Sequence, residues 1–217
     1  MKQDRWEIII LKPTPSFLSF LRDKLKNIDL PDLNLLHADP TAYAMLKQIN
    51  DDETLNEIER HFPKIFYNEI SRWFGDSIAN NIECSFLDFL CCFKFELHSQ
   101  IVLMEPKISD GLQLLCIKPR SVLCKWIKST SMVDDDLSNI MERINLSHLV
   151  EDSTVVIKNF KQLADVIPFV KHYYQPLFTA EMLRMCENKE QWPKVDSFLQ
   201  FKRYFTIEMH TQLIHLQ

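Results

Sequence analysis

One sixteen-residue stretch occurs twice in this chain, and it constrains the fold more than any other feature. Residues 85–100 read SFLDFLCCFKFELHSQ, and residues 197–212 read SFLQFKRYFTIEMHTQ. Eight of the sixteen positions are identical without a gap, whereas ordinary residue usage gives about one match by chance. The identical pairs are Ser85/Ser197, Phe86/Phe198, Leu87/Leu199, Phe89/Phe201, Phe93/Phe205, Glu96/Glu208, His98/His210 and Gln100/Gln212. We infer a tandem duplication, because self-similarity at a fixed offset is a fold-level signal.

The remaining sequence repeats one order of elements. Apolar runs predict strands over residues 6–11 and 112–117, both followed by Lys-Pro, and further strands over 41–47 and 154–158. Helices are expected to begin at Ser16, Glu53 and Ser121. Pro63 lies inside the second of these and predicts two helices that meet there, and the acidic run 134–136 predicts another short helix. Finally, residues 84–104 and their second copy are each expected to form a long Phe-rich helix.

These patterns predict a helix-rich α+β fold built as a tandem pseudo-repeat. Each half is expected to run β-α-β-α-α and to end in its long Phe-rich helix. A short polar connection that holds Pro106 and Gly111 predicts the boundary, with a first half over 1–105 and a second over 106–217. The two halves are either separate or packed as one compact unit.

On a helix, the identical positions fall on two sides. At 100° per residue, Phe86, Phe89, Phe93, Glu96 and Gln100 share one stripe that is aromatic at one end and polar at the other. In one interpretation the phenylalanines are core residues, and the polar residues cap or bridge to a neighbouring helix. In the other, the two stripes pack against each other between the repeats. The candidate inter-repeat residues are then Phe86, Phe89, Phe93, Glu96 and Gln100 with Phe198, Phe201, Phe205, Glu208 and Gln212.

Glu96, His98, Glu208 and His210 are of the residue types that form metal or acid–base sites. A helix would point Glu96 and His98 about 160° apart, unlike the i, i+4 spacing that lets two side chains reach one ion. We therefore expect no metal site there. The six cysteines lack the CxxC pairs of zinc modules and are expected to be reduced, buried thiols.

Composition excludes several function classes. The net charge is −5, and no dense run of Lys or Arg suits a phosphate backbone, so nucleic acid is not an expected partner. Only two glycines are present, which excludes the usual phosphate-cradling loops. No transmembrane span and no signal-peptide core are predicted. We expect no catalytic residues, no cofactor and no small-molecule ligand.

Two classes of function remain. The first is a non-enzymatic adaptor or binding subunit that contacts other protein subunits, with aromatic side chains as the candidate partner surface. These are Trp6, Trp126, Tyr173, Tyr174 and Trp192. The second is an enzyme whose site lies between the two halves, where pockets commonly form.

The scarcity of glycine, the short strands among Phe/Leu/Ile-rich helices, the unsignalled N-terminus and the scattered cysteines resemble a known class of proteins. They are similar to the accessory adaptor subunits of bacterial type IVB (Dot/Icm-type) secretion coupling complexes. The resemblance implies a cytoplasmic bacterial protein that docks on a coupling ATPase or its partner adaptors and helps to transport effector proteins. A secreted bacterial effector would have similar sequence features, and this is the alternative.

Overall fold

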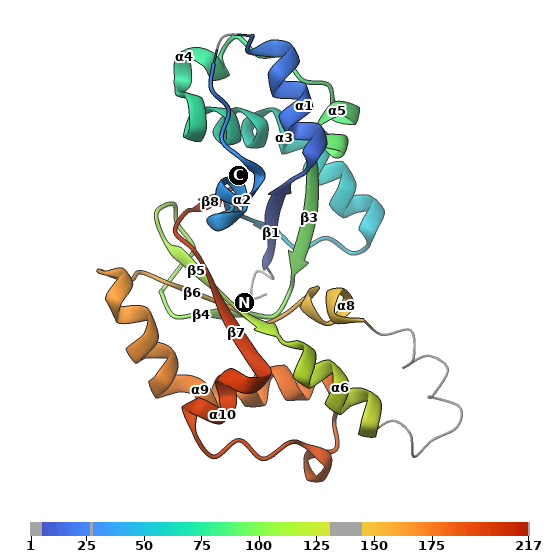
Figure 1. The fold of residues 1–217 in the computed structure, drawn as a ribbon, viewed down its shortest axis with the longest axis vertical. Coiled ribbons are helices and arrows are strands. Elements are labelled where there is room, and N and C mark those ends of the chain that lie inside the picture. Colours follow the sequence, from blue (N-terminus) through green and yellow to red (C-terminus); the bar gives the residue numbers. More distant parts are fainter. Residues whose placement is uncertain (1–5, 27, 131–144, 217) are drawn as a thin grey trace. The chain divides into compact units, whose positions relative to one another are not determined.

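The computed structural model describes residues 6–26, 28–130 and 145–216 (Figure 1). It is a mixed α/β structure with 50% helix and 22% strand, which confirms the predicted helix-rich α+β class. The chain divides into two compact units. Unit 1 comprises Met1–Leu97 and Thr211–Gln217, and unit 2 comprises His98–His210. The short helix predicted from the acidic run 134–136 lies outside the described residues.

Unit 1 is built around sheet A, whose strand order is β3-β1-β2-β8. Strand β2 is antiparallel to β1, and β8 lies parallel to β2 at the edge. Three of the predicted elements are confirmed here, namely the first two strands and the helix near Ser16. The elements of this sheet and its helices are β1 (Trp6–Pro13), α1 (Pro15–Lys24), α2 (Leu33–Ala38), β2 (Ala42–Leu46), α3 (Asp51–Phe74), α4 (Asp76–Ala79), α5 (Phe86–Cys92), β3 (Phe93–His98) and β8 (Leu213–His215).

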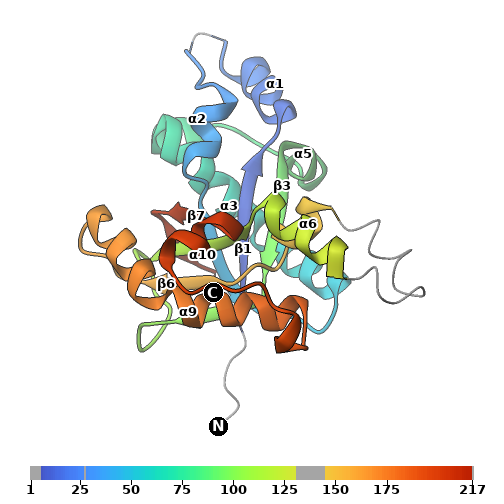
Figure 2. The same cartoon turned by 60° about the horizontal axis from the view of Figure 1, so that its bottom comes forward.

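Unit 2 is built around sheet B, whose strand order is β4-β6-β5-β7. Strand β5 is antiparallel to β6 and β7, and β4 lies parallel to β6 at the edge. Helices α6, α9 and α10 lie on one side of sheet B (Figures 1 and 2). The elements are β4 (Ile101–Leu103), β5 (Gln113–Pro119), α6 (Ser121–Thr130), α8 (Leu146–Val150), β6 (Val155–Lys158), η2 (Leu163–Asp165), α9 (Val166–Met185), η3 (Lys189–Gln191), α10 (Phe198–Tyr204) and β7 (Phe205–His210).

The edge strands β4 and β8 do not join the sheet of the strand that comes directly before them in sequence. Strand β4 follows β3 along the chain but pairs with β6 in sheet B, and β8 follows β7 but pairs with β2 in sheet A. The two compact units therefore differ from the predicted halves 1–105 and 106–217, because each of these three-residue strands finds its parallel partner in the other half of the sequence.

The predicted long helix over 84–104 is wrong. Helix α5 is only seven residues long, and from Phe93 (φ −131°, ψ 142°) the chain continues as a strand. The second copy behaves identically, with a seven-residue α10 and a strand from Phe205 (φ −127°, ψ 147°). In both copies the strand residues alternate between apolar and polar, which suits a pleated strand and not a helix. The identical Ser85 and Ser197 are N-caps that accept backbone N–H bonds at 3.1 and 3.3 Å.

The predicted break at Pro63 is also wrong, because α3 is one continuous helix of 24 residues. Pro63 lies on the exposed face of α3, where the carbonyl that loses its helical partner can bond to water instead. The N-cap of α3 is Asn50, whose side chain accepts from the N–H of Glu53 at 2.9 Å. At the other end Gly75 is the C-cap of α3 with φ +83°, a backbone conformation that glycine adopts readily.

The order of helices and strands shows which residues of unit 1 correspond to which residues of unit 2. Strand β1 and helix α1 precede β5 and α6 by 106 positions, β2 precedes β6 by 113, and everything from α3 onward precedes its counterpart by 112. The buried residues of α3 at 54, 58, 65, 66, 69 and 70 correspond in this way to the buried residues of α9 at 166, 170, 177, 178, 181 and 182. These correspondences support the tandem duplication, which stays a prediction.

Candidate functional site

The six identical phenylalanines lie in the hydrophobic cores. Phe89 and Phe93 are 0% and 2% exposed in unit 1, with ring centroids 5.2 Å apart. Their counterparts in unit 2, Phe201 and Phe205, are equally buried, and their centroids lie 5.1 Å apart. Phe86 and Phe198 pack against the same cores from the start of each short helix. The role predicted for these residues between the repeats stays a prediction.

The two identical glutamates form ion pairs with the lysines that precede the last residue of β1 and of β5. Lys12 Nζ donates to Glu96 in unit 1. In unit 2 Lys118 Nζ lies 2.8 Å from Glu208 Oε2, with the lysine side chain only 6% exposed. Both pairs are partly buried, and each joins neighbouring strands of one sheet, so they support the strand pairing of their own sheets.

The helical geometry that placed Glu96 and His98 on opposite sides is wrong. Both residues lie on β3, and residues two apart on a strand face the same way. On β7, His210 Nε2 indeed lies 3.3 Å from Glu208 Oε1. In the part of the chain that the structure describes, no group of three His, Cys, Asp or Glu side chains is placed to hold a metal ion.

The two identical glutamines mark the start of the edge strands. The side-chain oxygen of Gln100 accepts from Thr154 Oγ1 at 3.2 Å, and its backbone carbonyl accepts from the Val155 N–H at 2.9 Å. The backbone carbonyl of Gln212 accepts from the Ala42 N–H at 3.0 Å. Both glutamines therefore help to join an edge strand to its neighbour.

A matched aspartate fastens each edge strand to its sheet. Asp39 accepts from the backbone N–H of Thr211 at 2.9 Å and from the Thr211 hydroxyl, just before β8. Asp152 accepts from the N–H and hydroxyl of Ser99 at 2.6 and 2.8 Å, just before β4. Ser99 is the counterpart of Thr211, so the same device occurs in both units. The sequence contains this signal as two matched motifs, Asp39-Pro40-Thr41 and Asp152-Ser153-Thr154, but these motifs do not reveal the hydrogen-bond partners of the aspartates.

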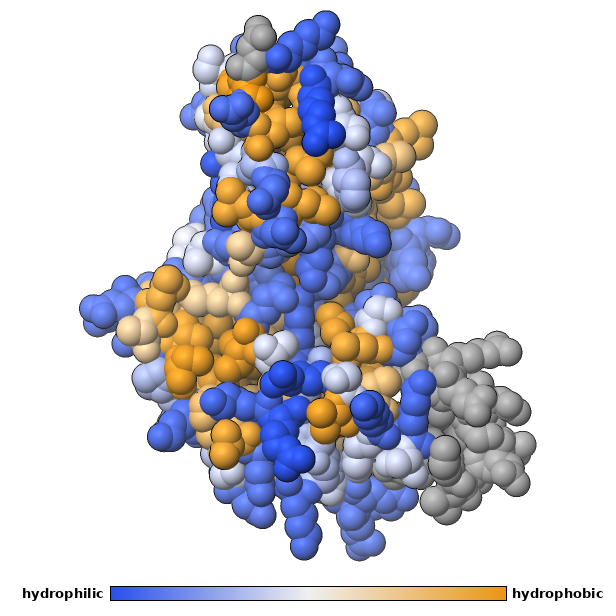
Figure 3. Space-filling view, in the orientation of Figure 1, coloured by the Kyte–Doolittle hydropathy of each residue, from blue (hydrophilic) through white to orange (hydrophobic). Residues whose placement is uncertain are grey.

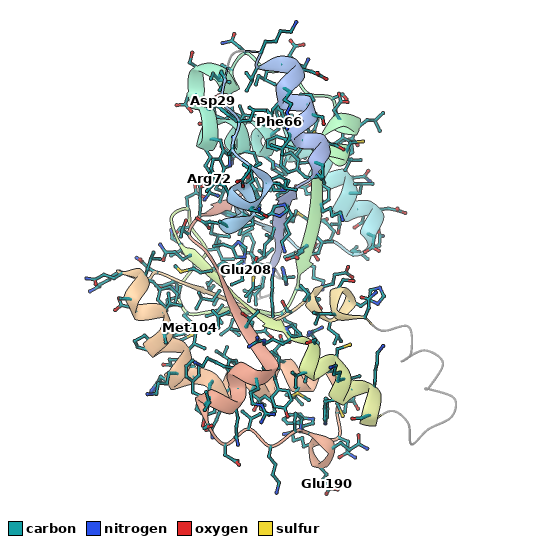
Figure 4. The ribbon with its side chains drawn as sticks, in the orientation of Figure 1. Asp29, Phe66, Arg72, Met104, Glu190 and Glu208 are labelled. Atoms are coloured by element: carbon teal, nitrogen blue, oxygen red, sulfur yellow. The ribbon has the colours of Figure 1, made fainter. Side chains whose placement is uncertain are left out.

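Unit 1 contains a network of polar side chains that joins helix α3 to strand β2 and the residues just before it. The hydroxyl of Tyr43, which is fully buried, donates to Glu69 Oε1 at 2.7 Å. Arg72 donates to Asp39 Oδ2 at 2.8 Å and to Thr41 Oγ1 at 3.0 Å (Figure 4). Burial raises the pKa of the Glu69 carboxyl above its ordinary value, although the Tyr43 hydrogen bond opposes this shift. Burial and the nearby Glu69 also raise the pKa of Tyr43 well above 10.0.

We expect Glu69→Gln to change how stability depends on pH. Because the pKa of Glu69 is raised in the folded state, the folded protein binds this proton more tightly than the unfolded chain. The wild type should therefore lose stability relative to Glu69→Gln as the pH rises from about 4.5 through the raised pKa. Urea unfolding across this pH range measures the difference, and Glu59→Gln, on the exposed side of α3, is the control. A stability difference that stays constant with pH would contradict the assignment.

An apolar cavity of about 80 Å³ lies in unit 2 between helix α9 and strands β4 and β6. Its opening includes Met104 and Tyr173, which are 39% and 36% exposed. Figure 3 shows an apolar patch in the region where Figure 4 places Met104. The lining carries no charged side chain and consists of Val102, Met104, Val156, Phe169, Tyr173, Pro176, Leu177 and Ala180.

The counterpart positions in unit 1 are filled and polar. Tyr43 is the counterpart of Val156, and its large ring occupies the space between sheet A and α3. The counterparts of Phe169, Tyr173, Pro176 and Ala180 are Glu57, His61, Lys64 and Asn68. The two units thus differ at these corresponding positions, which makes the cavity of unit 2 the candidate functional site.

The five aromatic residues predicted as a partner surface have different surroundings. Only Tyr173 lines the cavity. Trp6 packs against the His215 ring with centroids 4.9 Å apart, and Trp126 packs against the core of unit 2. The Tyr174 hydroxyl donates to the Asp196 carbonyl at 3.1 Å, and Trp192 Nε1 donates to the Cys186 carbonyl at 2.8 Å. Four of the five therefore have roles within their own units.

The prediction of buried thiols is wrong for four of the six cysteines, because only Cys92 and Cys116 are buried. All six are free thiols. Burial raises the pKa of Cys92 to about 12 and that of Cys84 to about 11. Since the thiolate is the nucleophilic form, these two thiols are poorly suited to nucleophilic catalysis.

No protein-family model, curated protein or solved structure is significantly similar to this chain. In the described parts of the chain, no helix combines the length and the apolar character needed to cross a bilayer. The site therefore has to be interpreted from its own geometry.

Proposed function

We propose that this protein is a non-enzymatic binding subunit of a multiprotein assembly. The observation that supports the proposal is the apolar cavity of unit 2, which opens to the surface at a position that unit 1 fills with Tyr43. Sites for drug-sized molecules measure about 300–1,000 Å³, so about 80 Å³ suits a single apolar side chain. Such a side chain belongs to a larger partner, and we propose that the partner is another protein.

The resemblance to accessory adaptor subunits of bacterial type IVB secretion coupling complexes suggests one assembly of this kind. In that setting the protein is cytoplasmic, and the cavity of unit 2 receives a segment of the coupling ATPase or of another adaptor. The assignment to this type of assembly rests on general sequence features alone, whereas the proposal of a binding cavity rests on the geometry of α9, β4 and β6.

Filling the cavity should weaken binding strongly. Short random peptides displayed on phage are selected on the full-length protein, and the enriched peptides are measured by titration against Ala180→Trp. We expect Ala180→Trp to weaken binding at least about tenfold, which corresponds to 1.4 kcal/mol of binding free energy, because the indole occupies the space that the peptide side chain needs. Asn68→Trp places the same residue at the counterpart position in unit 1 and should bind as the wild type does.

Two results would count against the proposal. One is a selection that enriches no peptide above background. The other is a set of enriched peptides that bind Ala180→Trp as tightly as the wild type.

A further inference from the structure

Strand β4, which lies beside the cavity, is an edge strand of sheet B. Some of its main-chain N–H and C=O groups point away from the sheet. The Gln100 carbonyl accepts from the Val155 N–H, and the Met104 N–H donates to the Ile157 carbonyl, so residues 100, 102 and 104 face β6. Alternation along the strand then directs the N–H and C=O groups of Ile101 and Leu103 away from sheet B. Among the described residues, neither of these two amide groups donates a hydrogen bond to the protein. An unpaired edge of this kind is a template for one more strand.

In unit 1 the corresponding edge strand, β8, is partly covered by a lysine of helix α3. The counterpart of Leu103 is His215, and its carbonyl accepts a hydrogen bond from Lys64 Nζ at 3.3 Å. The counterpart of Lys64 on helix α9 is Pro176, whose side chain has no donor. A lysine beside an edge strand is a recognised protection against strand addition. Unit 2 lacks this protection at the place where its cavity opens.

The flank of α9 that faces this edge is apolar over its whole length. Phe169, Tyr173, Pro176, Ala180 and Leu183 recur at spacings of three and four residues, which places them along one side of the helix. Leu183 is 48% exposed. A strand added beside β4 would direct alternate side chains toward this flank, in the way that extended peptides bind between an edge strand and a helix.

The charges of unit 2 favour an uncharged occupant. Unit 2 contains 14 Lys or Arg and 14 Asp or Glu, whereas unit 1 contains 11 and 16 and so carries the whole net charge of −5. The cavity lining adds no charge. A charged side chain would lose its hydration among these apolar side chains. The nearby Lys158, whose Nζ lies 5.9 Å from the centroid of the Phe169 ring, is already paired with Glu105, so the lining favours an apolar segment.

We propose that unit 2 binds an extended, uncharged, apolar segment of a partner protein as a fifth strand of sheet B alongside β4. This inference rests on the proposed function and adds the conformation and chemistry of the bound segment. The partner's main chain pairs with Ile101 and Leu103, and one of its alternate side chains enters the cavity beside Val102 and Met104.

A scan of N-methylated peptides tests this arrangement. Each backbone nitrogen of one enriched peptide is methylated in turn, which removes a single N–H donor and leaves the side chains unchanged. We expect alternate positions to lose binding about three- to tenfold, because only every second residue of an added strand bonds to β4. On the protein, binding should slow hydrogen exchange at the Leu103 amide, while the Val102 amide, which already faces β6, stays unchanged.

The possible failures are distinguishable. If sensitive positions recur three or four apart, or if no position is sensitive, the proposal of an added strand is overturned. The proposed function stands as long as Ala180→Trp still weakens binding at least about tenfold. Self-association of the wild type that Ala180→Trp removes would also overturn the inference, because the occupant would then be a second copy of this chain.

Discussion

Tyr43→Val is expected to lower the free energy of unfolding of unit 1 by about 4 kcal/mol. The substitution removes a fully buried ring from the space between sheet A and α3. It also removes the hydroxyl that donates to Glu69 Oε1 at 2.7 Å, which leaves a buried carboxyl without this donor. Tyr43→Phe keeps the ring and is expected to cost only about 1–3 kcal/mol.

Urea unfolding monitored by amide signals from each unit measures both variants. The matched control is Tyr173→Val, which shortens a partly exposed side chain in unit 2. A loss in Tyr43→Val no greater than that in Tyr173→Val would show that Tyr43 does not fill a cavity site, and the comparison between the two units would then fail.

Asp39→Ala is expected to destabilise unit 1 by about 3 kcal/mol and to loosen its C-terminal strand. The carboxylate accepts bonds from the N–H and hydroxyl of Thr211 and from Arg72, and hydrogen bonds to a charged group are the stronger ones. Loss of this attachment should speed hydrogen exchange throughout β8, because Asp39 holds the chain just before this three-residue edge strand begins.

The counterpart variant localises the effect. Asp152→Ala should speed exchange in β4 and leave β8 unchanged, since Asp152 bonds to Ser99 instead. Asp51→Ala, which alters an exposed carboxylate in the first turn of α3, is the control for loss of charge. Equal exchange rates in β8 of the wild type and Asp39→Ala would contradict the role of Asp39.

Local sequence patterns predicted four of the eight strands in the described residues, β1, β2, β5 and β6, and the helices that begin near Ser16, Glu53 and Ser121. The long helix over 84–104 failed because Phe86, Phe89 and Phe93 have helical spacing, which was extended past the true end of α5. The residues from Phe93 to His98 alternate between apolar and polar, and this period of two marks a strand. The same error separated Glu96 from His98, which in fact lie on one face of β3.

The exchange of edge strands could not be predicted from the sequence. A three-residue apolar segment such as β4 has the same local pattern whichever sheet it joins, and its partner β6 lies more than fifty positions away. The sequence does contain the signal for the cavity, because aligning the Asp39 and Asp152 motifs places Tyr43 opposite Val156. Only the structure shows that this difference leaves an open space under α9.

The most direct test is a methyl NMR titration of the full-length protein with one enriched peptide. Binding in the cavity predicts shifts at the methyl groups of Val102, Met104, Val156 and Leu177, with no shifts at their unit 1 counterparts Ile214, Leu216 and Ile65. Shifts confined to unit 1, or peptide binding that leaves the four methyl-bearing residues of unit 2 unchanged, would contradict the proposal that this cavity is the binding site.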